Sequence, residues 1–156
     1  MLVVKDLFER ILQILGTSRD SPLFQQLSTD LGDEPEAVIK HQYETVYLFR
    51  KTGFSISFDE VKGHYWHAFI HYGSAMTLSG RVTPYNGNLP AGILFGDDHE
   101  LVEEKLEKRP LSSKYIQGSS PDDLKDLWDV YELSSFKITF IFRAPTEQLA
   151  SVAIEC

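Results

Sequence analysis

Cysteine is almost absent from this sequence. The 156 residues include a single cysteine, Cys156, so no internal disulfide can form, and we expect a reducing, cytoplasmic location. No apolar run approaches the roughly 18 residues that a membrane-spanning helix needs. The start of the chain, Met1 to Asp6, has neither the charged region nor the long apolar region of a secretory signal. We therefore expect neither membrane insertion nor secretion through a signal peptide.

Positive charge is also scarce. The chain has 15 Lys and Arg against 23 Asp and Glu, which gives a formal net charge of −8. Binding to phosphate backbones needs clustered Lys and Arg, so we expect no nucleic-acid partner. A net negative charge favours binding to a basic protein partner. Many acidic proteins have no such partner and are simply soluble. The composition does not distinguish these two interpretations. With 42% hydrophobic and 12% aromatic residues, the chain is typical of a globular protein with a packed core.

Catalytic motifs are missing as well. The sequence contains no Gly-x-Ser-x-Gly, no Gly-x-Gly-x-x-Gly and no phosphate-binding loop. We therefore predict no catalytic residue, no cofactor and no enzymatic activity.

Two stretches of the chain nearly repeat each other. Gly53–Asp59 and Ser135–Ile141 share the core Phe-x-Ile-(Ser/Thr)-Phe, and this alternation predicts strands that bury one face. Upstream, Leu27-x3-Leu31-x3-Pro35 matches Val102-x3-Leu106-x3-Pro110. The ordered matches predict two copies of one unit, with an insertion in the second copy at residues 114–126.

These patterns predict an α+β fold. We expect a single domain, residues 1–156, made of two tandem helix–antiparallel-meander units, residues 1–80 and 81–156, with the helices packed on the sheet. Apolar spacing and capping residues predict helices at 4–15, at 23–31 and after Asp97 or Asp98, with a short one from Ser120 through Leu127. Strands are expected at 43–50, 54–58, 64–72, 136–143 and 149–154. Three residues of the third helix, Leu101, Val102 and Leu106, should face inward, and residues 93–95 should be buried.

The helix-entry region resembles that of known repeat families. Leu89-Pro90-x-Gly92-Ile93-x-Phe95-Gly96-Asp97, followed by Val102, Leu106 and Pro110, is similar to the motif of the SmpA/BamE-like and β-lactamase-inhibitor-protein-like families. The chain is also similar in style to small bacterial immunity proteins that neutralise toxin domains. The resemblance implies tandem repeats and a protein-binding role. The second copy departs from the motif because it lacks the glycine kept in Leu31-Gly32, and the lipobox of BamE-like lipoproteins is absent.

A histidine and aromatic stripe is the first candidate site. On a strand over 64–72, alternation places Tyr65, His67, Phe69 and His71 on one face. Such a stripe either packs under another element or forms a binding face. His67 and His71 would lie roughly 13 Å apart at about 3.3 Å per residue, which is too far for one zinc ion, so we predict no metal site there.

Acidic residues form the second candidate site. They comprise Glu103, Glu104 and Glu107 of the third helix, and Asp122, Asp123, Asp126 and Asp129 beside Trp128. One reading is an ordinary solvated face; the other is a cluster of fixed negative charge that docks into the basic cleft of a toxin nuclease.

The leading functional hypothesis is a non-catalytic, immunity-type or inhibitor-type protein that neutralises a partner, a toxin enzyme, by steric and electrostatic block. The alternative is a small-ligand-binding module or an uncharacterised enzyme with a site between sheet and helix near Tyr65, His67 and His71. A third reading is a structural subunit that adds to another chain through its sheet edge. The oligomeric state stays open.

Overall fold

The computed structural model describes residues 6–71, 75–77, 80–108, 114–119, 127–132, 135–143 and 146–156. Its helical elements are α1 (Leu7–Ile14), α2 (Leu23–Leu31), the 3-10 turn η1 (Pro90–Gly92) and α3 (His99–Lys108). Its strands are β1 (Glu36–Lys40), β2 (Glu44–Phe49), β3 (Phe54–Asp59), β4 (His64–His71), β5 (Ala75–Thr77), β6 (Gly80–Val82), β7 (Lys114–Ser119), β8 (Leu127–Glu132), β9 (Lys137–Arg143) and β10 (Gln148–Glu155). No helix in these ranges is long and apolar enough to cross a membrane.

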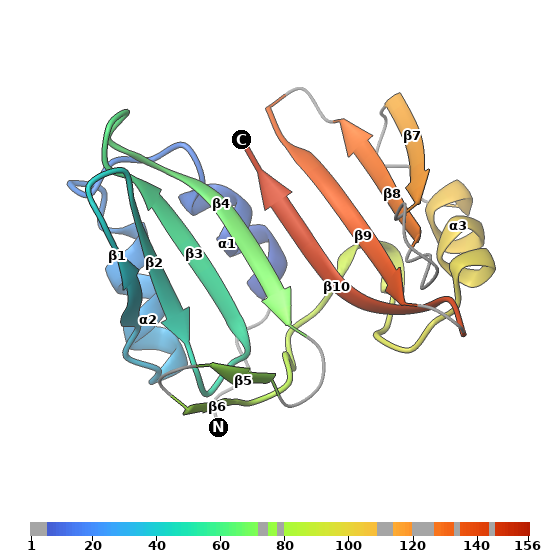
Figure 1. The fold of residues 1–156 in the computed structure, drawn as a ribbon, viewed down its shortest axis with the longest axis horizontal. Coiled ribbons are helices and arrows are strands. Elements are labelled where there is room, and N and C mark those ends of the chain that lie inside the picture. Colours follow the sequence, from blue (N-terminus) through green and yellow to red (C-terminus); the bar gives the residue numbers. More distant parts are fainter. Residues whose placement is uncertain are drawn as a thin grey trace.

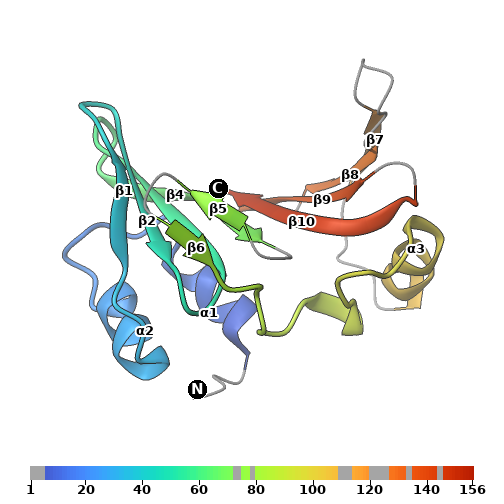
Figure 2. The same cartoon turned by 60° about the horizontal axis from the view of Figure 1, so that its bottom comes forward.

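The fold is α+β, as predicted, and is built on one antiparallel sheet of eight strands in the order β1-β2-β3-β4-β10-β9-β8-β7. Each half of the chain supplies four neighbouring strands, and β4 pairs with β10 where the halves meet. The three α-helices lie on the same side of the sheet (Figures 1 and 2). The two ends of the sheet rise away from the helices, so the opposite face is concave, and none of the helices in the described residues lies on it (Figure 2).

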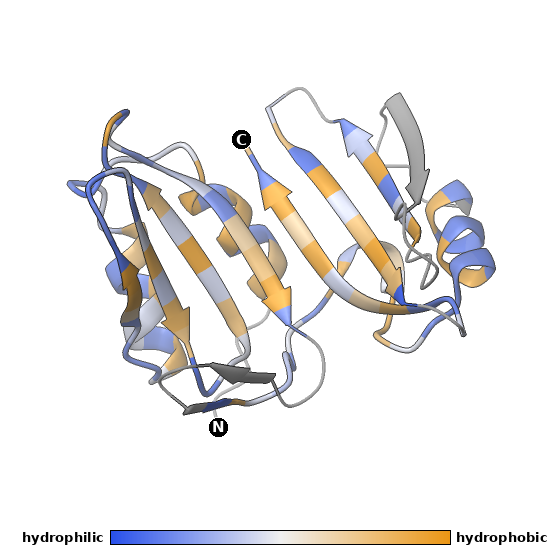
Figure 3. Ribbon diagram, viewed as in Figure 1, coloured by the Kyte–Doolittle hydropathy of each residue, from blue (hydrophilic) through white to orange (hydrophobic). Residues whose placement is uncertain are grey.

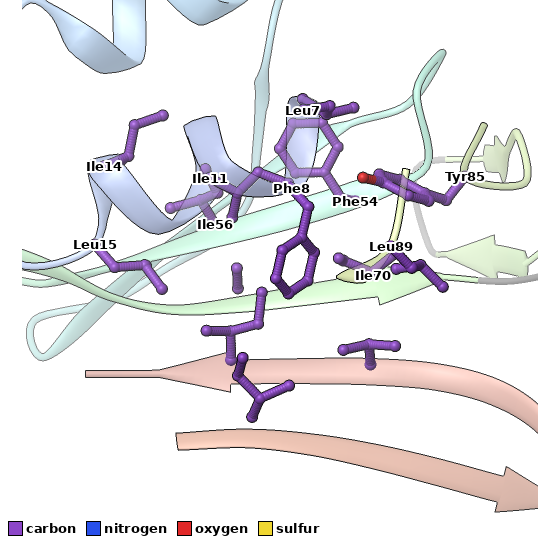
Figure 4. Close-up of a cluster of buried hydrophobic side chains, with 14 of the residues drawn as sticks. Leu7, Phe8, Ile11, Ile14, Leu15, Phe54, Ile56, Ile70, Tyr85 and Leu89 are labelled. Carbon is purple, nitrogen blue, oxygen red and sulfur yellow. The ribbon is translucent and has the colours of Figure 1, made fainter. Parts of the chain in front are cut away.

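The hydrophobic core lies between the helices and the sheet. Amphipathic spacing gives α1 four buried side chains, and Figure 4 shows Leu7, Phe8 and Ile11 packed over the strands. The repeated stretch is core, as predicted, because Phe54 and Ile56 are fully buried. Strand β9 alternates as predicted, with the apolar side chains at 138, 140 and 142 buried and the charged ends exposed (Figure 3).

The ends of two helices follow the predicted signals. Gly32 ends α2 with a left-handed φ of 63°, and Asp98 caps α3 by accepting a 2.8 Å hydrogen bond from the backbone N–H of Leu101. The buried carboxylate of Asp33, just after α2, accepts bonds of 2.9 and 2.8 Å from the backbone N–H and hydroxyl of Thr52. These bonds fix the end of α2 against the turn between β2 and β3.

Several local predictions were wrong. Strand β1 was not anticipated, and β7 occupies a stretch that was assigned to an insertion. Leu127 begins β8 and is not helical, since cross-strand pairing with β9 overrides its local helix signal; the rest of the predicted short helix, residues 120–126, lies outside the described residues. Leu94 and Leu101 were expected to be buried but are 65% and 37% exposed. Leu101 is exposed because Val102 and Leu106 fill the core-facing side of α3.

Candidate functional site

The predicted stripe on β4 is divided by a β-bulge. Ser57 pairs with His67 and Phe58 with Tyr65, so Trp66 is an extra residue without a partner in the ladder. The bulge shifts the alternation by one residue and turns Tyr65 towards the helices. There Tyr65 is 4% exposed and stacks on Phe24, with ring centroids 4.9 Å apart. The prediction that Tyr65 shares a face with His67, Phe69 and His71 was therefore wrong.

The remaining stripe residues lie on the concave side of the sheet. Directly paired residues of antiparallel strands share a face, and His71 pairs with Ser151, Ser151 with Ile141, and Ile141 with Trp128. Trp128, from the other half of the chain, therefore lies in the same row as His71. We call this surface the helix-free face; its larger side chains include Val46 and Leu48 of β2, His67, Phe69 and His71 of β4, Thr139 and Ile141 of β9, and Trp128 and Val130 of β8.

Phe69 lies at the centre of the helix-free face with small neighbours on both sides. It pairs with Ser55 of β3 and Ala153 of β10, so the side chains that flank its half-buried ring are much smaller than the ring. The ring of His71 lies edge-on to it at 4.8 Å between centroids. Burial lowers the pKa of both His67 and His71, although Glu155 opposes this shift at His67. The centre of the face is therefore aromatic, and burial favours the neutral form of both histidines.

The predicted acidic residues that the structure describes lie on the opposite side of the sheet. Asp129 pairs with the buried Phe140, which places its carboxylate on the helix side, where it is 0% exposed. Glu104 and Glu107 are exposed on α3 and line an open depression together with Glu103. Asp122, Asp123 and Asp126 lie outside the described residues. The predicted site residues thus occupy two faces, aromatic on one side and acidic on the other.

A compact polar cluster joins α3 to β8. The Nε2 atom of His99 lies 2.9 and 3.0 Å from the two carboxylate oxygens of Asp129 and 3.3 Å from Oε1 of Glu103. Nearby, burial together with the charges of Asp129, Glu103 and Glu107 raises the pKa of Tyr131 to about 12. His99 was not singled out from the sequence. The signal that identifies it is the i, i+4 spacing of His99 and Glu103 on one helix face.

A second polar network lies at the other end of the sheet. The guanidinium of Arg19 donates to both carboxylate oxygens of Glu60, at 2.9 and 2.5 Å, and lies 3.9 Å from the centre of the Phe58 ring. The hydroxyl of Thr45 also donates to Glu60, at 2.7 Å. The bond from Arg19, followed by the bond from Thr45, lowers the pKa of Glu60 to about 2.

This network predicts a loss of stability in acid. Because the folded-state pKa of Glu60 lies below its ordinary value of 4.5, the carboxylate stabilises the fold above pH 4.5, and this contribution disappears as the pH falls to about 2. Wild type should therefore be more stable than Glu60→Gln at pH 6, and the two should converge near pH 2 in urea unfolding. Glu34→Gln, at an exposed carboxylate, should be as stable as wild type at pH 6. Equal stability of wild type and Glu60→Gln at pH 6 would contradict this account.

Comparisons with known proteins identify one similar fold but no protein family. No protein-family model matches the sequence, and no curated protein matches it. A solved structure of an extracellular protein containing a SCP domain from Bacillus anthracis str. Ames is similar, with a TM-score of 0.55 and 12% sequence identity. The match covers 99% of this chain and 48% of that one, so this chain spans about half of its length. At this identity the likeness concerns the fold alone.

Proposed function

We propose that this chain is a non-catalytic protein-binding protein of the immunity or inhibitor type, which blocks a partner through its helix-free face. The observation that carries the proposal is the position of Phe69, a partly exposed aromatic ring between small neighbours on a broad concave sheet. Aromatic side chains in such positions supply much of the binding energy of protein interfaces. The small-ligand alternative has less support, because Tyr65 points to the core while His67 and His71 point the other way.

Electrostatics adds a second part to the proposal. The net charge of −8 favours a basic partner, and fixed charge raises association rates even when it lies outside the contact surface. The exposed carboxylates of α3 lie on the other side of the sheet from Phe69. We therefore assign them to long-range attraction of a basic toxin domain, and the helix-free face to contact.

The proposal extends to the tandem arrangement of the fold. The β3–β4 and β9–β10 hairpins have four-residue turns that close alike: Gly63 donates its N–H to the carbonyl of Asp59 at 2.8 Å, and Glu147 to that of Arg143 at 3.0 Å. The last turn residue has a positive φ in both, 78° at Gly63 and 55° at Glu147. The second strand of each hairpin then has one bulged residue at its third position, which is Trp66 in β4 and Ala150 in β10. These shared features support two copies of one unit.

The pairing of β4 with β10, where the two halves meet, supports the same arrangement. Aligning the hairpins by their bulges makes Phe69 equivalent to Ala153 and His71 to Glu155. Phe69 pairs directly with Ala153, its own equivalent, as residues on a two-fold axis do. At the centre of the helix-free face the two proposed copies therefore differ, because the first has the aromatic ring of Phe69 where the second has Ala153.

Location is part of the proposal too. Cys156 carries a free, exposed thiol, which suits a reducing compartment, so the cytoplasm remains the proposed location. The solved structure that shares the fold belongs to an extracellular protein, so fractionation of the native host should decide between the two.

The function is tested with the protein encoded next to this one. We expect a toxin-like neighbour whose purified catalytic domain forms a stable complex with this chain and loses its activity in the complex. Size-exclusion chromatography and a toxin activity titration measure the two effects. A host without a toxin-like neighbouring gene, or a neighbour that neither binds nor is inhibited, would contradict the proposal.

A further inference from the structure

A polar recess lies at the outer end of the first half, between the β1–β2 turn and the loop that joins α1 to α2. It is lined by Arg19, residues 40–42, Thr45, Tyr47 and Glu60, and it opens to solvent. Its volume of 560 Å³ lies within the roughly 300–1,000 Å³ of small-molecule sites. The recess is on the helix side of the sheet, because Thr45 pairs with the core residue Phe58. It is therefore separate from the helix-free face.

The carboxylate of Glu60, which lines the recess, is already bonded at both oxygens. Arg19 donates to each oxygen, and the hydroxyl of Thr45 adds a bond to Oε1. Arg19 also donates to the hydroxyl oxygen of Tyr47 at 3.1 Å. Three of the five N–H groups of Arg19 are thus used, and within the described ranges its Nε–H and one Nη1–H have no acceptor. The hydroxyl hydrogen of Tyr47 has none there either. Glu60 therefore holds Arg19 in place and leaves donors over.

The β1–β2 turn orients a further donor. Nδ1 of His41 accepts hydrogen bonds from the backbone N–H groups of Tyr43 and Glu44, at 3.1 and 3.2 Å. A ring nitrogen that accepts hydrogen bonds carries no proton, so the proton of the neutral imidazole is on Nε2. The Glu44 carboxylate lies 3.9 Å from Nε2, which is beyond hydrogen-bond distance. His41 therefore offers an N–H to the recess, beside the exposed side chains of Lys40 and Gln42.

Charge and geometry favour a tetrahedral anion as the ligand. Arg19 and Glu60 balance each other, so Lys40 gives the lining a net positive charge although the whole protein carries −8. The spare donors come from three segments: the loop before α2, the β1–β2 turn and strand β2. A carboxylate has only two oxygens in one plane, and the bidentate position on Arg19 is already occupied by Glu60. A phosphate group presents oxygens in tetrahedral directions, which suits donors that converge from several sides.

We propose that this recess binds the phosphate group of a small molecule, which is either inorganic phosphate or a phosphate monoester. The phosphate accepts hydrogen bonds from Arg19, His41 and Tyr47 and pairs with the charge of Lys40. In this position it joins the loop between α1 and α2 to the β1–β2 turn. The site uses none of the residues of the helix-free face, so it does not depend on the proposed function.

Titration of the full-length chain with inorganic phosphate at low ionic strength, followed by backbone amide NMR, tests the proposal. We expect saturable shifts at residues 17–22, 41–44 and 60. Lys40→Gln should weaken phosphate binding by about threefold to fivefold, the effect of losing one exposed charge pair. Tyr47→Phe, which removes only a hydroxyl, should also weaken it. Lys51→Gln, the same change at an exposed lysine beyond the other end of β2, should keep the wild-type affinity.

Two further ligands identify the source of the phosphate and its chemistry. Tighter binding of glycerol 3-phosphate than of phosphate would assign the site to monoesters, and the reverse order would assign it to the free ion. Acetate that binds as tightly as phosphate would overturn the proposal. Equal phosphate affinity of Lys40→Gln and Lys51→Gln would overturn it too, as would shifts that spread over the surface without saturating. The amide spectrum of each variant shows whether it is folded.

Discussion

Replacing Gly53 by alanine should destabilise the protein by about 2–5 kcal/mol. Gly53 has a φ of +90°, and an added Cβ would lie 2.5 Å from the backbone nitrogen of Tyr85 and closer still to the carbonyl oxygen of Thr83. The unfavourable φ costs about 1–2 kcal/mol and the overpacking about 1–3 kcal/mol. The added Cβ would meet backbone atoms, which cannot move aside as a flexible side chain can.

Gly16 provides a matched control for this substitution. It has the same φ of +90°, but an added Cβ would meet nothing within 4 Å. Gly16→Ala should therefore lose only the conformational part, about 1–2 kcal/mol. Urea unfolding of both variants measures the difference. Equal losses would show that residues 83–85 do not pack against the turn between β2 and β3 as described.

Replacing Asp129 by alanine should destabilise the protein by about 1–3 kcal/mol, the loss expected when a buried hydrogen-bonding group loses its partner. Asp129 is 0% exposed, and its carboxylate is directed at His99. The substitution leaves the imidazole of His99 without this charge and opens space beside Phe140. Urea unfolding measures this effect.

Two variants make this prediction specific. Glu104→Ala, on the exposed side of α3, should change stability by less than about 0.5 kcal/mol. In a double-mutant cycle, His99→Ala combined with Asp129→Ala should cost less than the sum of the two single changes, because the groups contact each other. A loss below about 1 kcal/mol for Asp129→Ala would mean that the pair does not hold α3 on the sheet.

Local patterns in the sequence were sufficient for much of the fold. Apolar spacing identified α1 and α2, and Asp98 and Gly32 marked helix ends, since each signal depends on residues close in the chain. Alternation in residues 136–142 identified the buried face of β9 for the same reason. Strand β1 has only five residues, mostly exposed, so no buried pattern marks it.

The candidate site was harder to predict because it depends on long-range pairing. Simple alternation grouped Tyr65 with His67, and a bulge at Trp66 separates them; the bulge is defined by pairing with β3 and leaves no mark in the local sequence. Trp128 lies in the same row as His71 through two intervening strands. Their common face depends on the pairing of β4 with β10, between distant parts of the chain.

The alignment of the two proposed copies shows the same limit. The Phe-x-Ile-x-Phe pattern aligns Phe58 with Phe140, whereas the bulged hairpins align Phe58 with Phe142. Both alignments match buried residues with buried residues, because they differ by two residues, the period with which side chains alternate between the faces of a strand. Hairpin geometry distinguishes them, and apolar alternation does not.

Affinity for the proposed toxin-like partner is the most direct test of the helix-free face. Isothermal titration should show that Phe69→Ala weakens binding by at least about tenfold, a loss of about 1.4 kcal/mol typical of an interface anchor. Val61→Ala, at a 71% exposed residue in the β3–β4 turn, should bind as wild type does. The combined variant Glu100→Gln, Glu104→Gln and Glu107→Gln should bind more slowly but with a smaller loss of affinity. Wild-type affinity for Phe69→Ala, with binding lost in the α3 variant, would contradict the account and place the contact on the acidic side.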